Sequence, residues 1–573
     1  MGGVLGTSGS LVIDHTMDDV PLHQMRNDSL RHGSIATITG GDSPPAYKDD
    51  PARLLEKPEE RRARKRSHWV AYTTMFVMSI GFSIVLSGVW PYLHELDKNL
   101  QKESLGWVIA ANPLGQMLAS PLLGLWGNKS GSIRLACLST VVMFIFGNIM
   151  YSLLSLFNNM GEMAPYYAMI VSRFIVGVSS ANVTLCRSYL ASSTTLQERT
   201  VGISIIAAAQ ALGFVIGPGI QAILTVAIPD GVDTGVSWFV WDKFTAAGWV
   251  AGLLGFINLV LLLPCVFTEY NIADKEREML KLSRQDDENM KLPKPNYVGI
   301  CGVLFAFFIV LNMYVLLETL AVPFVMDQYA WSESKAMIVV GVALSAGGLL
   351  SSFIYVLNGI LSKKYDERKV VILLGLLPMI VGTFLFLPWG NGKIHIQVCH
   401  LAGDNTTTVM TTTELTTASG TPETDYISYL LAEATNDTTQ ICDYGCPASQ
   451  TWCENTPKLP EVQLLIAFII TFSGYPVAQG IIQAIFSKML GPKPQGVWMG
   501  ILTGVGSFSR IMGPIFVSYV YTDFGTRWCF GILSCGMVLA LVDLIVFYKR
   551  LIPMKLPDVN NKHAYDGPAS ERS

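Results

Sequence analysis

Long apolar stretches separated by short polar segments run through most of the chain, from about residue 69 to residue 548. A helix needs about 20 predominantly apolar residues to cross a bilayer. Twelve stretches have that length, six on each side of a charged segment at 269–296. The pattern therefore predicts an all-α membrane protein with twelve transmembrane helices as two six-helix pseudo-repeats. The predicted spans are 69–92, 104–126, 133–157, 165–190, 200–228 and 245–268 in the first half, and 297–322, 334–361, 368–388, 461–487, 495–521 and 526–548 in the second.

The two halves carry a similar Gly-Pro motif at a similar depth. Gly213, Gly217 and Pro218 lie in the fifth predicted span, and Gly513 and Pro514 lie in the eleventh. In lipid, a weakened helix is tolerated only where neighbouring helices or a water-filled cavity satisfy its freed carbonyl groups. We therefore expect helix breaks at these residues, in helices that line or brace a central path. Paired interruptions of this kind indicate a transporter with an internal repeat.

Composition supports membrane insertion and argues against several function classes. The chain is 50% hydrophobic and only 15% charged, whereas a soluble protein carries about 25% charged residues. No metal-ligand spacing, phosphate-binding glycine loop or nucleophile motif stands out, so we expect neither enzyme activity nor a metal or other cofactor. The net charge of −4 and the lack of a basic stripe interleaved with aromatics argue against nucleic acid as a partner. The first residues lack the pattern of a cleavable signal peptide, so the first span is expected to direct insertion itself.

Lysine and arginine residues gather on one side of the predicted membrane. A basic run at 61–66 precedes the first span, and further basic residues lie between spans two and three, between spans eight and nine, and after the last span. Because basic residues favour the cytosolic side, both termini are expected to face the cytosol. The predicted domains are a disordered cytosolic tail at 1–66, an N-terminal six-helix bundle at 67–268, a cytosolic linker at 269–296, a C-terminal six-helix bundle at 297–550 with a lumenal loop at 389–460, and a cytosolic tail at 551–573.

The large lumenal loop carries signs of an oxidising compartment. It holds glycosylation sequons at Asn405 and Asn436. Its four cysteines suggest two disulfides, although three pairings are open and four free thiols are the alternative. The cysteines are Cys399, Cys442, Cys446 and Cys453.

Four ionisable residues lie inside predicted spans. A charge at mid-bilayer costs at least ~2.5 kcal/mol, so each needs a partner or a function. Arg173 and Arg187 are separated by about four helical turns, which predicts that they share one face of the fourth span. Arg510 precedes the second Gly-Pro pair, and Glu318 lies in the seventh span.

Two interpretations of these charges are open. The arginines can brace the bundle through backbone carbonyls, or they can form a cationic cavity that lowers the barrier for an anion. Glu318 can titrate and couple protons, or it can form an ion pair with Arg510 or Arg173. Uncharged polar residues are further candidates for lining the path, although such residues more often hydrogen-bond between helices. The candidates are Asn112 with Gln116, Gln479 with Gln483, and singly Asn182, Gln210, Asn312 and Tyr314.

Several short segments between about residue 68 and residue 552 are distinctive when taken together. They are Leu105–Ala110 with Leu114–Met117, Arg187–Tyr189, Leu196–Thr200, Gln210–Gly213, Leu387–Asn391, Gly491–Val497 and Tyr548–Leu551. These segments resemble the major facilitator superfamily, and within it a branch of endolysosomal membrane proteins.

Superfamily motifs fit the chain with some departures. Gly124 and Lys129 match the loop motif after span two, but Asn128 stands where that motif has an acidic residue. Arg173 and Gly177 resemble the span-four motif that is often tied to proton coupling.

The span-five motif also departs from the family pattern. Gly213, Gly217 and Pro218 resemble the antiporter motif, although Ile220 differs from its closing glycines. The resemblance implies an endolysosomal location and, for this branch, a chloride conductance. The fold alone does not determine what is transported, because one transporter fold supports many functions. The residues of the site must decide it.

A short motif in the N-terminal tail agrees with that location. Asp50, Leu54 and Leu55 resemble an acidic dileucine sorting signal, which would bind a clathrin adaptor. The leading hypothesis is therefore passage of chloride or another small anion across a late endosomal or lysosomal membrane. The alternatives are a proton-coupled transporter of a small organic solute and a scaffold that does not transport.

Overall fold

The structure, a computed structural model, describes residues 56–554 except 97–102, 229–240, 276–294, 402–439 and short gaps at 87, 162, 196–197, 391, 398, 443, 448–449 and 492. The described residues belong to one compact unit, Leu54–Ser573. The predicted glycosylation sites Asn405 and Asn436 lie outside the described residues, as do the sorting residues Asp50, Leu54 and Leu55.

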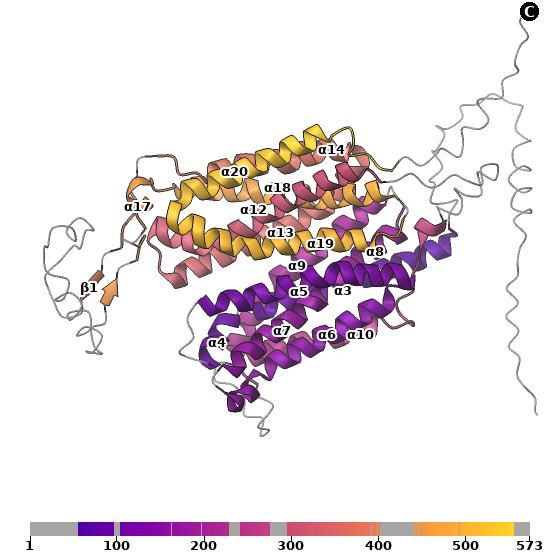
Figure 1. The fold of residues 1–573 in the computed structure, drawn as a ribbon, viewed down its shortest axis with the longest axis horizontal. Coiled ribbons are helices and arrows are strands. Elements are labelled where there is room, and N and C mark those ends of the chain that lie inside the picture. The colour runs from indigo at the N-terminus through magenta and orange to yellow at the C-terminus, as the bar shows by residue number, and fades with distance from the viewer. Residues whose placement is uncertain are drawn as a thin grey trace, which may run out of the picture. The chain divides into compact units, whose positions relative to one another are not determined.

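The fold is a bundle of long helices, as predicted from the apolar stretches (Figure 1). The helices of the first half are α3 (Pro58–Leu86), α4 (Val89–Leu96), α5 (Glu103–Ser130), α6 (Arg134–Ser152), α7 (Ala164–Ser180), α8 (Asn182–Ser193), α9 (Arg199–Ala227) and α10 (Thr245–Leu261), with a 3-10 turn at Leu154–Met160. Those of the second half are α12 (Tyr297–Tyr329), α13 (Glu333–Lys364), α14 (Glu367–Val370), α15 (Leu377–Leu385), α18 (Glu461–Leu490), α19 (Gly496–Phe516) and α20 (Thr522–Val546), with π-helical turns at Val371–Leu376 and Val517–Tyr521.

Each of the twelve predicted spans corresponds to helix in this order, which confirms the all-α fold class. Among the described residues, ten helical segments are long and apolar enough to cross a membrane. One of them, Gly496–Val546, contains both α19 and α20, and the shorter apolar helix Thr245–Leu261 accounts for the remaining span.

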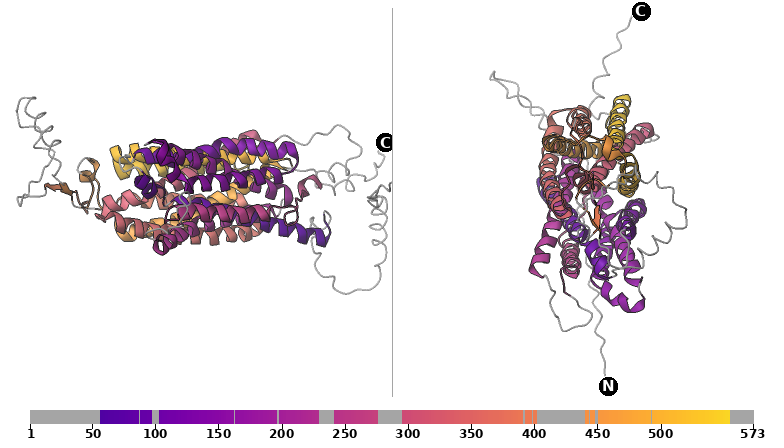
Figure 2. Two further views of the ribbon diagram at one scale, coloured as in Figure 1. Left: turned by 90° about the horizontal axis from the view of Figure 1, so that it is seen from below. Right: turned by 90° about the vertical axis from the view of Figure 1, so that its left-hand side faces the viewer.

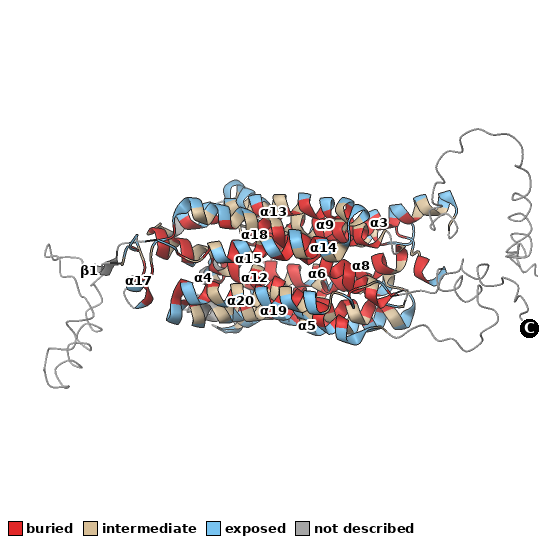
Figure 3. Ribbon diagram, turned by 90° about the horizontal axis from the view of Figure 1, so that it is seen from above, coloured by how far each residue is buried: buried red, intermediate tan, exposed pale blue. Residues whose placement is uncertain are grey.

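The helices of each half pack around their own buried core. One apolar cluster is built mainly from α12, α18 and α20, and a second from α3, α6, α7 and α10. Buried positions alternate with exposed ones along the helices (Figure 3). Many exposed side chains are large and apolar, including Leu122, Val226 and Phe353. Such extensive apolar exposure is typical of a surface that faces lipid.

The two ends of the bundle differ. The terminal end carries the first residues of α3 and the segment after α20, and the loop end carries the short strands β1 (Cys399–Leu401) and β2 (Gln440–Cys442) (Figures 1 and 2). At the terminal end α3 begins at Pro58, inside the tail that we expected to be disordered up to residue 66. That expectation was wrong for this part of the tail, because Arg64 forms ion pairs with Glu56 and Glu198 that fix the first turns of the helix.

The predicted helix breaks at the Gly-Pro pairs are not present. The α9 helix runs through Pro218 without interruption, and α19 continues past Gly513 and Pro514 to Phe516 before a π-helical turn. In α9 the glycines serve close packing instead. A Cβ atom on Gly213 would lie 2.7 Å from the Phe76 carbonyl oxygen of α3. A Cβ on Gly217 would clash with α3 as well, so the motif lets two helices touch along their backbones.

The loop end contains one disulfide among the described residues, between Cys446 and Cys453. The antiparallel strands β1 and β2 place Cys399 directly opposite Cys442 in the backbone register. Trp452, in the short helix α17 (Trp452–Asn455), donates a hydrogen bond of 3.2 Å to the Thr522 carbonyl at the start of α20. This contact holds the cysteine-rich segment against the second half of the bundle.

Candidate functional site

A small polar cavity lies between the two halves of the bundle. Its polar lining includes five residues that the sequence singled out, namely Asn112 and Gln116 of α5, Asn182 of α8, Gln210 of α9 and Arg510 of α19. The cavity has a volume of about 30 Å³, which is room for about two water molecules. The structure thus brings together candidates that are almost four hundred residues apart in the chain.

Arg187 lies next to this cavity on α8. Its Nη2 donates a hydrogen bond of 3.2 Å to Gln210 Oε1, and the side chain is only 5% exposed. Gln210 in turn lines the cavity together with Arg510. Two guanidinium groups from opposite halves of the protein therefore approach one place.

Neither guanidinium forms an ion pair with a described residue. Within the part of the chain that the structure describes, no carboxylate lies within 4.0 Å of Arg187 or Arg510. The carbon of the Arg510 guanidinium lies 5.9 Å from the centre of the Phe214 ring, at the outer limit of a cation–π contact.

Glu318 is an acidic residue within electrostatic range of Arg510. It lies on α12 with an exposed side chain, and its charge acts on Arg510, Tyr314 and Tyr475. Of the two partners that the sequence left open, the structure places Glu318 near Arg510. The site therefore contains two positive groups and one negative group.

Gln116 connects the halves directly. Its Oε1 accepts a hydrogen bond of 2.9 Å from Ser507 of α19, and its Nε2 donates one of 3.0 Å to the Ser180 carbonyl oxygen. Asn112 on the same face donates to the Arg173 carbonyl oxygen at 3.4 Å. Of these three bonds, the one between Gln116 and Ser507 joins the two halves, so it must break if the halves separate.

Three tyrosines of the second half, Tyr314, Tyr355 and Tyr475, pack together near this site but are not among the residues that line the cavity. The sequence singled out Tyr314 but not the other two. The rings of Tyr314 and Tyr475 stack with centroids 4.3 Å apart. The Tyr355 hydroxyl donates a hydrogen bond of 2.5 Å to Gln479 Oε1. Gln483, one turn further along α18, is buried, and its amide has no hydrogen-bond partner among the described residues.

Arg173 does not join the cationic pair, which corrects the expectation that it shares a face with Arg187. The fourth span is divided at the turn residue Ala181, where α7 ends at Ser180 and α8 begins at Asn182. The Arg173 guanidinium packs over the Tyr151 ring of α6 at 4.6 Å from its centre. It is 3% exposed and does not line the cavity. A cation–π contact on a desolvated ring is worth about 2 kcal/mol, which makes a bracing role physically sufficient.

The halves also meet at the terminal end. Asn128 Oδ1, at the position where the loop motif has an acid, accepts a hydrogen bond of 2.9 Å from the Gly496 amide at the start of α19. A neutral amide thus satisfies a free N–H group at a helix start, the task that an acid would otherwise perform. Nearby, Arg199 donates a hydrogen bond of 3.3 Å to the Ser487 carbonyl oxygen. These contacts hold the terminal end closed in this conformation.

Comparisons with known proteins agree with this architecture. The sequence model of the Major Facilitator Superfamily matches residues 71–425 and 448–571. The chain is 37% identical to "Major facilitator superfamily domain-containing protein 8" of Xenopus laevis, over 87% of this chain and 94% of that protein. It is 24% identical to the class E tetracycline resistance protein of Escherichia coli, over 87% of this chain and 99% of the relative.

Two solved structures share the fold. The human organic anion transporter MFSD10 superposes with a TM-score of 0.56 at 16% identity, and the match covers 85% of this chain and 100% of that one. The proton:xylose symporter XylE superposes with a TM-score of 0.56 at 14% identity, and the match covers 88% and 99% of the two chains.

Proposed function

Since this chain belongs to the major facilitator superfamily of membrane transporters, we propose that it moves a small anion, with chloride the simplest candidate, across the membrane of a late endosome or lysosome. The observation that carries this proposal is that Arg510 of the second half lines one cavity with Gln210, which accepts a hydrogen bond from Arg187 of the first half. The cavity size suits a small anion that has shed most of its water.

The charge balance of the site supports an anion as the transported species. Arg187 and Arg510 contribute two positive charges, and Glu318 contributes one negative charge when it is ionised. A buried cation without a partner is costly, because its desolvation is not repaid by a nearby opposite charge. One monovalent anion between the guanidiniums would neutralise the site and supply that missing partner.

The closed terminal end supports a carrier cycle in preference to a permanently open pore. Transporters of this architecture expose a central site to each side in turn by rocking one half against the other. The bonds from Asn128 to Gly496 and from Arg199 to Ser487 join the halves and must break when the terminal end opens.

The proposal is tested with purified protein in liposomes. Under a chloride gradient, we expect the flux to saturate and the reversal potential to follow chloride. Replacement of chloride by nitrate should preserve flux, and replacement by gluconate should remove it. Equal flux with gluconate, or none with any inorganic anion, would reject small-anion transport.

Gln210→Glu should weaken anion transport through charge alone. The new carboxylate would lie about where Gln210 Oε1 now accepts from Arg187 at 3.2 Å, and it would neutralise that cation. We expect the apparent affinity for chloride to fall about tenfold, since a close buried charge pair is worth at least ~1.4 kcal/mol. Gln210→Met, which has a similar length and no charge, is the control, and equal losses in the two variants would argue against an electrostatic cause.

A proton-coupled transporter of a small organic solute is the second candidate. The exposed Glu318 carboxylate within range of Arg510 favours it, because a carboxylate in a transport path is a natural proton carrier. Under this hypothesis, Glu318→Gln abolishes uptake driven by a pH gradient but leaves solute exchange intact. If uptake follows the pH gradient equally well in the variant, Glu318 does not couple protons.

The location and topology follow as further proposals. We propose that both termini face the cytosol, that Asn405 and Asn436 carry glycans in the lumen, and that Cys399 pairs with Cys442 beside the Cys446–Cys453 bond.

We also propose that Asp50, Leu54 and Leu55 bind a clathrin adaptor. Replacing Leu54 and Leu55 with alanine should move the protein from vesicles to the plasma membrane, as measured by surface biotinylation. Unchanged vesicular staining would remove the sorting role, and an Ala52→Ser variant in the same tail is the control.

A further inference from the structure

The segment after the last helix does not leave the bundle directly. Residues 551–554, here named the strap, turn back across the terminal end of the second half. The Met554 amide donates a hydrogen bond of 3.1 Å to the Lys488 carbonyl oxygen near the end of α18. Leu551 is 2% exposed and Met554 is 9% exposed, so two apolar side chains anchor the strap.

The end of α18 is shaped to receive Met554. Gly491 follows the helix with a φ of 69°, a conformation that favours glycine. A Cβ atom at Gly491 would lie 2.6 Å from the Met554 sulfur, so the side chain occupies the space that this glycine leaves open. The strap and the C-terminal turn of α18 therefore fit together closely.

The same turn of α18 holds the contacts between the halves. The Lys488 side chain forms an ion pair of 2.7 Å with Glu367, and the same carboxylate oxygen accepts a hydrogen bond from Thr200 of the first half. The neighbouring Ser487 carbonyl accepts from Arg199, which also belongs to the first half. Lys488 is thus bound through its carbonyl to the strap and through its side chain to the closed interface.

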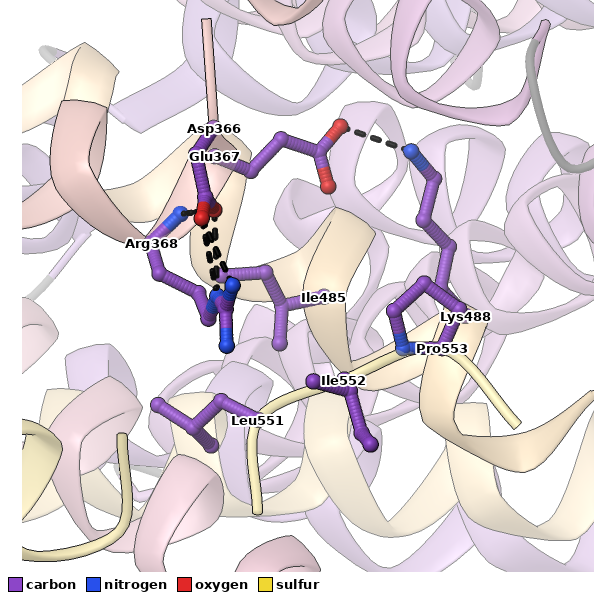
Figure 4. Close-up of a pocket in the computed structure, with 8 residues that line it drawn as sticks. All are labelled: Asp366, Glu367, Arg368, Ile485, Lys488, Leu551, Ile552 and Pro553. Carbon is purple, nitrogen blue, oxygen red and sulfur yellow. Dashed lines mark hydrogen bonds and ion pairs between the residues drawn. The ribbon is translucent and has the colours of Figure 1, made fainter. Parts of the chain in front are cut away.

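A cavity lies between the strap and this ion pair (Figure 4). It has a volume of about 140 Å³ and is lined by Lys488 and Glu367, by the Asp366–Arg368 pair, and by the strap. The hydrogen bonds from Arg368 hold the pKa of Asp366 below its usual range, so that carboxylate stays charged at neutral pH. The cavity gives the Lys488 and Glu367 side chains room to exchange partners when the strap moves.

We propose that the strap is a regulatory clasp, which stabilises the state closed at the terminal end and must leave α18 before that end opens. A docked strap fixes the last turn of α18, so that the Ser487 carbonyl and the Glu367 carboxylate are in position for Arg199 and Thr200. An undocked strap frees this turn, weakens both contacts and shifts the protein toward the opposite state. The clasp acts on the gate whichever solute the protein carries.

The test measures the gate directly in the full-length protein. Spin labels at the exposed positions Lys129 and Lys364, one on each half, report the separation at the terminal end. The exposed cysteines Cys265, Cys301 and Cys535 are replaced by serine in this background. Double electron–electron resonance then gives the distribution of distances between the two labels. From it follows the ratio of molecules that are open to molecules that are closed at that end.

Met554→Asp should raise the open-to-closed ratio about tenfold, which is a typical size for coupling between two sites. Met554→Ala should shift it less and in the same direction. Lys549→Asp adds the same acid at an exposed position outside the strap and should leave the ratio unchanged. An unchanged ratio in both Met554 variants, with normal thermal unfolding, would overturn the proposal.

Thr200→Val tests the connection from the other half. It removes the hydroxyl that binds Glu367, so it should raise the open-to-closed ratio without touching the strap. If the strap acts through Lys488 and Glu367, adding Met554→Asp to Thr200→Val should give less than the product of the two separate effects. If the effect of the double variant equals the product of the two single effects, the strap does not act on this interface, and the proposal is overturned.

Discussion

Arg510→Ala is expected to reduce anion flux about 100-fold, which corresponds to about 2.7 kcal/mol of lost stabilisation of the bound anion. The loss follows from the position of Arg510, which lines the cavity and has no ion pair among the described residues. Arg510→Lys should keep much of the flux, since it preserves the charge. Chloride efflux from liposomes with equal amounts of folded protein measures both variants.

Arg527→Ala is the matched control for this experiment. Arg527 is an exposed arginine on α20, and its removal should leave flux unchanged. Arg187→Ala should resemble Arg510→Ala, because the two guanidiniums act on the same place. If Arg510→Ala and Arg527→Ala have the same flux, the anion does not use this site.

Gly496→Val is expected to stop the transport cycle without unfolding either half. The start of α19 meets α5 backbone to backbone, and a Cβ atom at Gly496 would clash with the Gly124 carbonyl oxygen and lie 2.5 Å from Asn128 Oδ1. Forcing extra volume into a tight contact costs about 1–3 kcal/mol, here only in the state closed at the terminal end. We expect that state to lose population by about tenfold or more, and flux to fall with it.

The spin-label distance between Lys129 and Lys364 measures this shift, and chloride efflux measures its consequence. Gly504→Ala is the control on the same helix, since the nearest atom to its new Cβ would be the Met117 carbonyl oxygen at an ordinary 3.5 Å. A closed distance in Gly496→Val with normal flux would show that this glycine contact is not part of the gate.

The helices could be predicted from the sequence because the length of an apolar stretch alone decides whether it can span a bilayer. The charged residues Arg187, Arg510 and Glu318 were also visible in advance, since ionisable groups are rare in such stretches. Their meeting point was not predictable, because it depends on how α8, α12 and α19 pack.

Two expectations failed for local reasons. Arg173 and Arg187 have the spacing of one helix face, but that inference required a continuous helix, and Ala181 separates α7 from α8. The Gly-Pro pair at Gly217 and Pro218 indicated a break, but its glycines provide a close contact between helices instead.

Other features carried no signal in the sequence. Tyr355 and Tyr475 are two of 21 tyrosines in an apolar chain, and nothing in their spacing distinguishes them from ordinary core residues. The sequence of the strap likewise did not predict its docked position. That position depends on contacts of Met554 with Gly491 and Lys488, which lie about sixty residues earlier. Contacts between distant segments, and not local preference, determine both features.

The most direct test locates the anion itself. Bromide is a heavier substitute for chloride, and its anomalous scattering marks its position in crystals of the protein. We expect one strong bromide peak between the Arg187 and Arg510 guanidiniums, and its loss in Arg510→Ala. A peak beside Arg173 with none at the cavity, or no peak within the bundle, would contradict an anion site between the two halves.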